Sequence, residues 1–270
     1  MKTIIEPKKG LQFPDCKELL RYRDLFYFFV WRDIKVRYKQ TVMGFTWALI
    51  RPLFSMGIFS VVFGGLAKVP SDGVPYPVFS YAALVPWTYF SAAMTGSTGS
   101  LVGNPMLSKI YFPRLIVPMT PVLANLIDFS IAFMFAGVLM LWFKIMPTIY
   151  ILYIPLLVLM MMLTAAGIGM WLSALAVQYR DIKVANTFLS QLLMYAAPVV
   201  WPASLVPEQY RLLYGLYPMV GVIEGFRSAM IGTNPMPWDL IITGSISAII
   251  LCVSGAFYFR FKERIFADVV

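Results

Sequence analysis

Residues 149–177 read IYILYIPLLVLMMMLTAAGIGMWLSALAV and contain no charged side chain. A helix rises about 1.5 Å per residue and the hydrocarbon core of a bilayer is about 30 Å thick, so about 20 apolar residues are enough to cross it. This stretch is longer than that. It therefore predicts a helix that spans a membrane.

Five further apolar runs divide the rest of the chain into short polar pieces. The six runs are 43–66, 76–100, 115–142, 149–177, 184–202 and 239–259, of which 184–202 only just reaches the length of a span. Hydrophobic residues make up 60% of the chain and charged residues 13%, whereas soluble domains are about 45–50% apolar and about 25% charged. The sequence predicts an all-α integral membrane protein with six transmembrane helices.

Positive charge is distributed unevenly among the polar pieces. Eighteen of the 22 Lys and Arg residues lie in the first 51 residues, in the loops 101–114 and 178–183, and in the tail from Arg260 onward. Cytoplasmic loops of membrane proteins carry an excess of Lys and Arg, so both termini and both loops are predicted to be cytoplasmic. This placement accounts for the net charge of +9 without a nucleic acid as partner.

The first 42 residues are predicted to form a cytoplasmic head, and residues 43–270 a six-helix transmembrane domain. Asp15 can cap a helix, with Glu18 at the capping-box distance. Around these two residues, Leu and Phe side chains are mixed with the cations Lys17, Arg21 and Arg23. The pattern predicts an amphipathic interface helix on the inner membrane face. A plain anchor without a partner is the alternative.

The segment before the last run has a different pattern. Two weakly apolar pieces, about 206–217 and 219–231, are separated by Tyr217-Pro218. Each is too short to span, and apolar runs of about 10–14 residues are candidates for re-entrant or interfacial helices. We therefore expect residues 203–231 to form a helical hairpin that dips in from the external side.

Charged side chains inside a bilayer are costly and often functional. Arg51 lies in the first run, where it either extends to the inner surface or faces a water-filled cavity. Asp128 lies in the third run. It is either a functional group or a carboxylate that is hydrogen-bonded where two helices meet.

Several kinds of chemistry are absent from the sequence. The chain contains no histidine and no G-x-x-x-x-G-K-[ST] motif, so it lacks the usual phosphate-binding loop of nucleotide hydrolases. It has no cluster of metal ligands. We therefore predict no catalytic residue, no metal site and no cofactor on this chain, and expect any energy to come from a partner or an ion gradient.

Short motifs along the chain have the order and spacing of a known family. They are Arg32-Asp33-Ile34-Lys35-Val36-Arg37-Tyr38 with Gly44 and Trp47, Asn104-Pro105 through Lys109, Phe112-Pro113-Arg114 and Pro118, Tyr179-Arg180-Asp181-Ile182, Pro198-Val199 with Pro202, Pro218 through Arg227, and Phe266-Ala267-Asp268. From about residue 13 to 270, the chain resembles the membrane (permease) subunit of bacterial ABC exporters for surface polysaccharides. That group moves O-antigen, capsular polysaccharide or teichoic acid.

The resemblance implies a homodimer of this chain with two copies of a separate cytoplasmic ATPase that binds ATP and Mg. It implies that two inner loops dock on the ATPase through Asn104, Lys109, Arg114, Tyr179, Arg180 and Asp181. It further implies that the interface helix with Lys17, Arg21 and Arg23 touches the ATPase and that the hairpin 203–231 corresponds to the external gate helices. From the residues alone, Arg180 and Asp181 could instead simply cap helices.

Aromatic residues make up 16% of the chain. Flat rings stack on sugar faces, and the polar ends of Tyr and Trp make hydrogen bonds. The candidates for a gate or pore are Trp47, Arg51, Trp87, Tyr89, Asp128, Tyr195, Trp201, Glu224 and Arg227. The alternative for the aromatic residues is the belt that Trp and Tyr form at membrane interfaces.

The expected function is export of lipid-linked polysaccharide, O-antigen before others, from the cytoplasm across the bacterial inner membrane. Teichoic acid or capsule is the alternative cargo. A drug or a lipid is a further alternative, but exporters of these cargoes often carry a large external domain, for which the sequence between the apolar runs leaves no room. A proton-coupled transporter that uses Asp128 is a second mechanism. A membrane glycosyltransferase would need acidic residues that converge at one membrane face, and only Asp128 and Glu224 are available.

Overall fold

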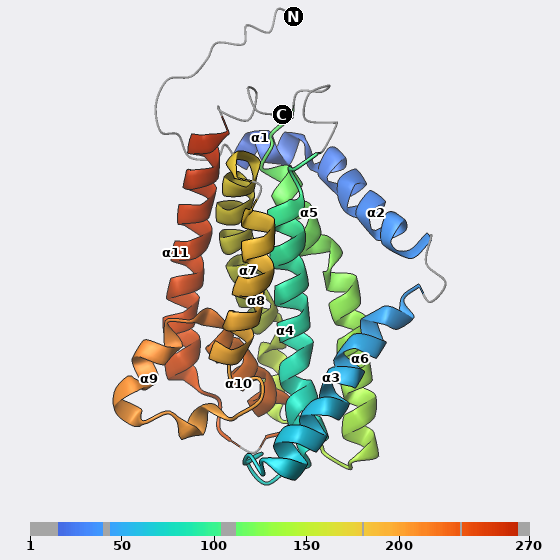
Figure 1. Cartoon of the computed structure of the whole chain (residues 1–270), viewed down its shortest axis with the longest axis vertical. Helices are drawn as coiled ribbons and strands as arrows, with labels where there is room; N and C mark the ends of the chain where they lie inside the picture. The colour runs from blue at the N-terminus through green and yellow to red at the C-terminus, as the bar shows by residue number, and fades with distance from the viewer. Residues whose placement is uncertain (1–15, 40–43, 104–111, 180, 233, 264–270) are drawn as a thin grey trace, which may run out of the picture.

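The structure is a computed structural model, and it describes residues 16–39, 44–103, 112–179, 181–232 and 234–263, with side chains from Leu19 onward (Figure 1). All regular secondary structure in these ranges is helical. The α-helices are α1 (Cys16–Arg21), α2 (Arg23–Lys39), α3 (Thr46–Phe59), α4 (Tyr76–Gly99), α5 (Ile116–Ala124), α6 (Leu126–Trp142), α7 (Ile154–Gln178), α8 (Ile182–Ala196), α9 (Glu208–Gly215), α10 (Pro218–Met230) and α11 (Trp238–Lys262). A π-helix, η1 (Ser60–Leu66), continues α3, and short 3-10 helices are η2 (Ile149–Tyr153) and η3 (Ala203–Leu205).

Four helical segments among the described residues are long and apolar enough to cross a membrane. They are Thr46–Leu66, Ile116–Trp142, Ile149–Gln178 and Trp238–Lys262. These segments coincide with four of the six apolar runs and indicate a multi-pass membrane protein. α4 has 24 residues but many Tyr, Ser, Thr and Gly side chains, and α8 has only 15 residues. The count of six spans stays a prediction.

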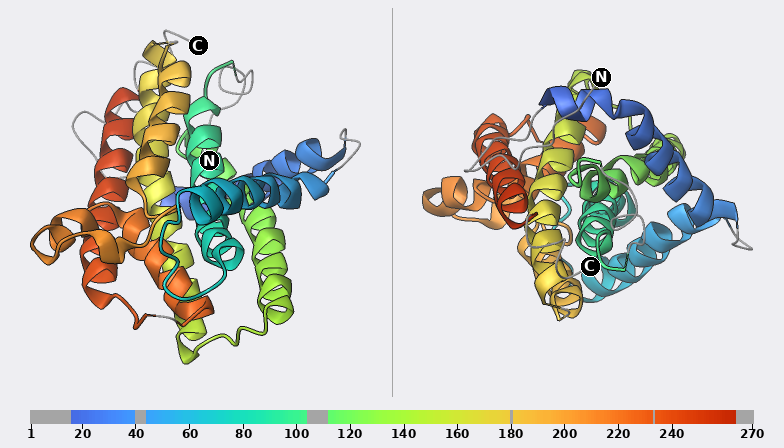
Figure 2. Two further views of the ribbon diagram at one scale, coloured as in Figure 1. Left: turned by 60° about the horizontal axis from the view of Figure 1, so that its bottom comes forward. Right: turned by 90° about the horizontal axis from the view of Figure 1, so that it is seen from above.

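α4 and α7 form the middle of the bundle. Seen along the bundle, α11 lies on one side and α3 on the other, with α4 and α7 between them (Figure 2). Most side chains of α4 are buried, although it is less apolar than α5, α6 and α7. Its hydroxyl-bearing and small residues therefore contact protein.

The two ends of the bundle hold different helices and are called the head end and the hairpin end. The head end holds α1, α2 and the C-terminal end of α11 (Figure 1). There, Lys262 Nζ donates to Gln178 Oε1 at 3.2 Å. The opposite, hairpin end holds α9 and α10, and Asn234 Nδ2 donates to Asp72 Oδ2 at 2.8 Å. The first and last described helices thus end on the same side, as the prediction for the termini requires.

The head differs in detail from the predicted helix. The helix is divided at Tyr22 and continues to Lys39. Arg21 and Arg23 flank the division with exposed side chains, whereas the side chain of Lys17 lies outside the described residues. Apolar residues occur on more than one side of α2, since Phe28 is 55% exposed and Phe29 only 3%. The prediction of one amphipathic interface helix is therefore not confirmed.

The segment 203–231 contains two short helices, α9 with 8 residues and α10 with 13. Pro218 occupies the first turn of α10, where its missing N–H costs nothing. All residues of α10 are buried, whereas Leu212, Leu213 and Leu216 beside it are exposed. The two helices lie where the two apolar pieces occur, and their insertion into a bilayer stays a prediction.

Candidate functional site

A polar cluster joins the head to the bundle where α5 meets α6. Arg37 Nη1 donates to Asn125 Oδ1 at 2.7 Å and to Asp128 Oδ2 at 2.5 Å. The hydroxyl of Tyr38 donates to Asp128 Oδ1. Asn125 Nδ2 in turn donates to the carbonyl of Pro121 at 2.7 Å. We call Arg37, Tyr38 and Asp128 the head latch.

The latch keeps the phenol of Tyr38 protonated. Burial and the hydrogen bond to the Asp128 carboxylate raise the pKa of Tyr38 above its ordinary value, so the phenol stays a proton donor at neutral pH. Arg37 supplies the positive charge that compensates Asp128. Of the two interpretations of Asp128, the structure places the carboxylate in a contact between helices. The sequence analysis did not single out Arg37 and Tyr38, although both belong to the motif 32–38.

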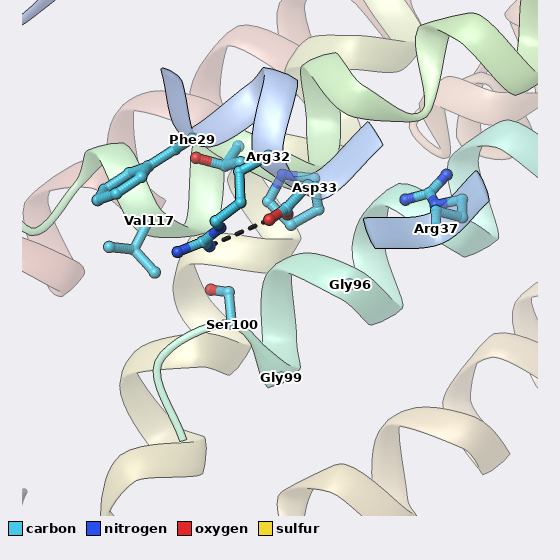
Figure 3. A pocket seen from close by; sticks show the side chains of 10 residues that line it. Phe29, Arg32, Asp33, Arg37, Gly96, Gly99, Ser100 and Val117 are labelled. Carbon is cyan, nitrogen blue, oxygen red and sulfur yellow. Dashed lines mark hydrogen bonds and ion pairs between the residues drawn. The ribbon is translucent and has the colours of Figure 1, made fainter. Parts of the chain in front are cut away.

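A cavity of about 290 Å³ lies next to the latch, between α2, α4 and α5 (Figure 3). Its lining residues are Phe29, Arg32, Asp33, Arg37, Gly96, Gly99, Ser100, Val117, Thr120 and Pro121. Arg32 Nη2 donates to Asp33 Oδ1 at 3.1 Å. The described residues include no group of three His, Cys, Asp or Glu side chains that could hold a metal ion.

The predicted docking loops meet the end of α11 at the head end. Arg114 Nη1 donates to the carbonyl of Glu263 at 3.1 Å, and Glu263 is paired with Arg260 at 2.9 Å. Tyr179, next to Gln178, is 57% exposed. Lys262 at the end of α11 binds Gln178 in the second loop, and the next residue, Glu263, binds Arg114 in the first. The end of α11 thus contacts both loops through consecutive residues.

Asp181 directly precedes α8, and its side chain is exposed and makes no capping hydrogen bond. Among the described residues, its backbone carbonyl accepts from the N–H groups of Val184 and Ala185. Capping therefore does not account for the carboxylate of Asp181. Asn104, Lys109 and Arg180 lie outside the described residues.

A buried ion pair stabilises the hairpin end. Arg227 Nη1 donates to Glu224 Oε1 at 2.8 Å, and Nη2 donates to the carbonyl of Val199 at 2.9 Å. The guanidinium lies 3.6 Å from the ring centre of Phe79, which belongs to α4. Glu224 also accepts from the backbone N–H of Ala203 at 3.1 Å. The pair therefore connects α10 to α4 and to the segment after α8.

The aromatic candidates separate into buried and exposed residues. Trp87 and Tyr89 are 4% and 3% exposed, and the Tyr89 hydroxyl donates to the carbonyl of Val122 at 2.8 Å. Trp201 stacks on Tyr214, with 5.6 Å between ring centres. Within this chain, these three rings pack against other residues, and their role in a gate or pore stays a prediction.

Trp47 and Arg51 on α3 and Tyr195 on α8 are exposed. α3 and α8 lie on the same side of the bundle (Figure 2). The exposed side chains of α8 follow a helical spacing, at Val184, Phe188, Leu192 and Tyr195. Its opposite side contacts α4, where Ser190 and Ser91 are hydrogen-bonded at 2.7 Å. The exposed sides of α3 and α8 together form the α3–α8 face.

Comparisons with known proteins agree with a transport function. The chain is 26% identical to the O-antigen export system permease protein RfbA of Myxococcus xanthus over 94% of this chain and 98% of the relative. It is 22% identical to the polysialic acid transport protein KpsM of Escherichia coli, over 74% of this chain and 78% of the relative. It is also 22% identical to the capsule polysaccharide export inner-membrane protein CtrC of Neisseria meningitidis, over 87% and 89%.

The sequence model of one family covers most of the chain. It is that of the ABC-2 type transporters, and it matches residues 24–231. The matched region begins in α2 and ends directly after α10, so it includes the head latch, both predicted docking loops and residues 203–231. Together with the four apolar helices, the relatives indicate a multi-pass protein of the inner membrane. The chain belongs to the ABC-2 type transporter family.

Proposed function

We propose that this chain is the permease subunit of an ATP-driven exporter that moves lipid-linked polysaccharide, O-antigen in particular, out of the cytoplasm. The main support is the similarity to an O-antigen export permease over 94% of this chain and 98% of that relative. Such coverage leaves no large part of either protein unmatched. The capsule polysaccharide export relative is covered over 89% of its length, which makes capsule the second candidate cargo.

ATP hydrolysis takes place on a separate subunit that binds ATP and Mg. The chain has no phosphate-binding loop, and its loops at the head end expose Tyr179 and Asp181. Asn104, Lys109, Arg114 and Arg180 complete the docking surface, together with Lys17, Arg21 and Arg23 of the head. The end of α11 is positioned to relay force between the two loops, because it binds both Arg114 and Gln178.

Two copies of the chain enclose the path of the glycan. The α3–α8 face supports this proposal, because it combines apolar residues with the exposed rings of Trp47 and Tyr195. Arg51 lies on the same face and would meet the path where the glycan enters. Glu224 and Arg227 are buried in the hairpin and hold the external gate in position.

The fold crosses the membrane six times, with α4 and α8 as the two further spans. Residues 43–270 form this permease domain, and residues 1–42 form the cytoplasmic head. α2 is the interface helix, and its outer side carries Phe28 and Trp31 next to Lys35, whose ammonium lies 5.2 Å from the Trp31 ring centre. Rings and cations in this arrangement suit the headgroup region of a bilayer.

The partner is tested by purifying the tagged chain from native membranes in mild detergent and identifying its partners by mass spectrometry. We expect a soluble ATPase with a Walker A motif, recovered in equal amount with this chain. Repeated recovery of the folded chain alone would contradict the proposal.

Deleting the chain in its host tests the cargo. Loss of surface O-antigen with normal capsule supports the first candidate, and the reverse supports capsule.

A further inference from the structure

We propose that the head latch transmits movement of α2 to α6, so that Arg37, Tyr38 and Asp128 are positioning residues that couple the head to the transport path. This inference rests on the proposed function, in which the head moves with the ATPase. It assigns a role to an ion pair between two elements whose members are 91 residues apart in the sequence.

α2 is held to the bundle at two separate places. At the first, Phe29 is buried in a cluster with Leu101, Phe112, Ile116, Met170 and Phe259, and its ring meets Phe112 edge to face at 5.5 Å. At the second, Arg37 and Tyr38 bind Asp128. Phe29 and Arg37 are about 12 Å apart along the helix. A helix fixed at two such points moves as one rigid piece.

Between these two places, the cavity of about 290 Å³ separates α2 from the end of α4 (Figure 3). Phe29 and Arg37 lie on opposite sides of it in this view. A Cβ atom built at Gly99, on the cavity wall, would meet nothing within 4 Å. α2 therefore has room to tilt about Phe29, and a tilt would displace Arg37.

The latch contacts the bundle where a helix is interrupted. α5 contains Pro121, and Asn125 separates α5 from α6. Proline removes one backbone hydrogen bond and makes such a place a preferred point of bending. Arg37 binds Asn125 at the interruption and Asp128 in the first turn of α6. A displacement of Arg37 therefore acts directly on the first turn of α6, just after the interruption.

The side chains of Arg37 and Asp128 are 35% and 29% exposed in the structure, and partly exposed ion pairs contribute little to stability. A loss of export without a loss of melting temperature therefore distinguishes transmission from simple stabilisation. Arg211 and Asp239 at the hairpin end form a comparable pair, with 2.6 Å between Nε and Oδ2 and exposures of 42% and 39%. That pair contacts neither the head nor α6, so it serves as the matched control.

The test compares Asp128→Asn, Arg37→Gln and Tyr38→Phe with the control Asp239→Asn, in the full complex with its ATPase. Surface glycan is measured in the host, and ATP hydrolysis and thermal unfolding in the purified complex. We expect the first two latch variants to export at least tenfold less glycan, with assembly, melting temperature and ATP hydrolysis retained. Tyr38→Phe removes one donor and should lose less. The control should export normally.

A charge exchange provides the second arm. The double variant Arg37→Asp with Asp128→Arg restores an ion pair between α2 and α6, and we expect it to recover export above either single variant. Normal export by Asp128→Asn and Arg37→Gln would overturn the proposal. The proposal would also be overturned if the variants that lose export had a clearly lower melting temperature than the wild-type chain. Failure of the wild-type chain to bind an ATPase would instead contradict the proposed function, and the two failures are thus distinguishable.

Discussion

At the scale of single residues, Arg227 has the most demanding surroundings. It is 3% exposed and is satisfied by Glu224, by the carbonyl of Val199 and by the face of Phe79. We predict that Arg227→Met costs about 3–5 kcal/mol, because it leaves a buried carboxylate without its cation. The control Arg211→Met removes an exposed pair and should cost about 0–1 kcal/mol. Thermal unfolding in detergent measures both, and equal shifts would contradict the prediction.

The same residues show how far the sequence could predict the site. Arg227 and Glu224 are separated by one helical turn, so their pairing is accessible from spacing alone. The hydrogen bonds of Arg227 to Val199 and of Arg37 to Asp128 join residues far apart in the sequence. Such partners depend on how helices pack, and hydropathy contains no information about that. The motif 32–38 marked Arg37 as part of a unit, but no local pattern indicated its partner.

At the scale of elements, the contact between α7 and α11 depends on two glycines. A Cβ atom at Gly167 would lie 2.6 Å from the backbone carbonyl carbon of Leu251, and one at Gly255 would lie 2.5 Å from the carbonyl oxygen of Gly167. Small residues allow such close approach of membrane helices. Gly167→Ala should therefore destabilise by about 1–3 kcal/mol. Gly137→Ala, where a Cβ would meet nothing within 4 Å, should stabilise by roughly 0.5–1 kcal/mol. Destabilisation of similar size in both variants would refute this packing.

The helices themselves were predictable to different degrees, for physical reasons. Long apolar runs predicted the four strongest spans, because length and hydropathy are properties of one segment. α8 ends at Ala196, before Pro198, since a residue that precedes proline is disfavoured in the helical conformation. The run 184–202 is therefore longer than its helix. The head continues through Lys39, beyond the region where capping residues and cations pointed to a helix.

At the scale of the whole molecule, hydrogen bonds show which helices meet at each end of the bundle. The distribution of charge predicts which of these ends faces the cytoplasm. Besides the cations of α1 and α2, the head end holds Arg114, Lys183, Arg260 and Lys262. The described hairpin end holds fewer cations, at Lys68, Lys144, Arg211 and Arg227. The excess of Lys and Arg predicts that the head end faces the cytoplasm. The four strongly apolar segments are even in number, which agrees with two termini on one side. The observed position of α1 beside the end of α11 places the first and last described helices at the same end of the bundle (Figure 1).

Labelling of single cysteines in intact cells tests this orientation. Lys183 at the start of α8 and Glu208 at the start of α9 are both exposed and lie at opposite ends. With Cys16 and Cys252 replaced by serine, Glu208→Cys should react with a membrane-impermeant maleimide in cells whose outer membrane has been permeabilised. Lys183→Cys should react only after the inner membrane is opened. Labelling of Lys183→Cys in closed cells would reverse the orientation and separate the docking loops from any cytoplasmic ATPase, because Tyr179 and Asp181 lie beside it.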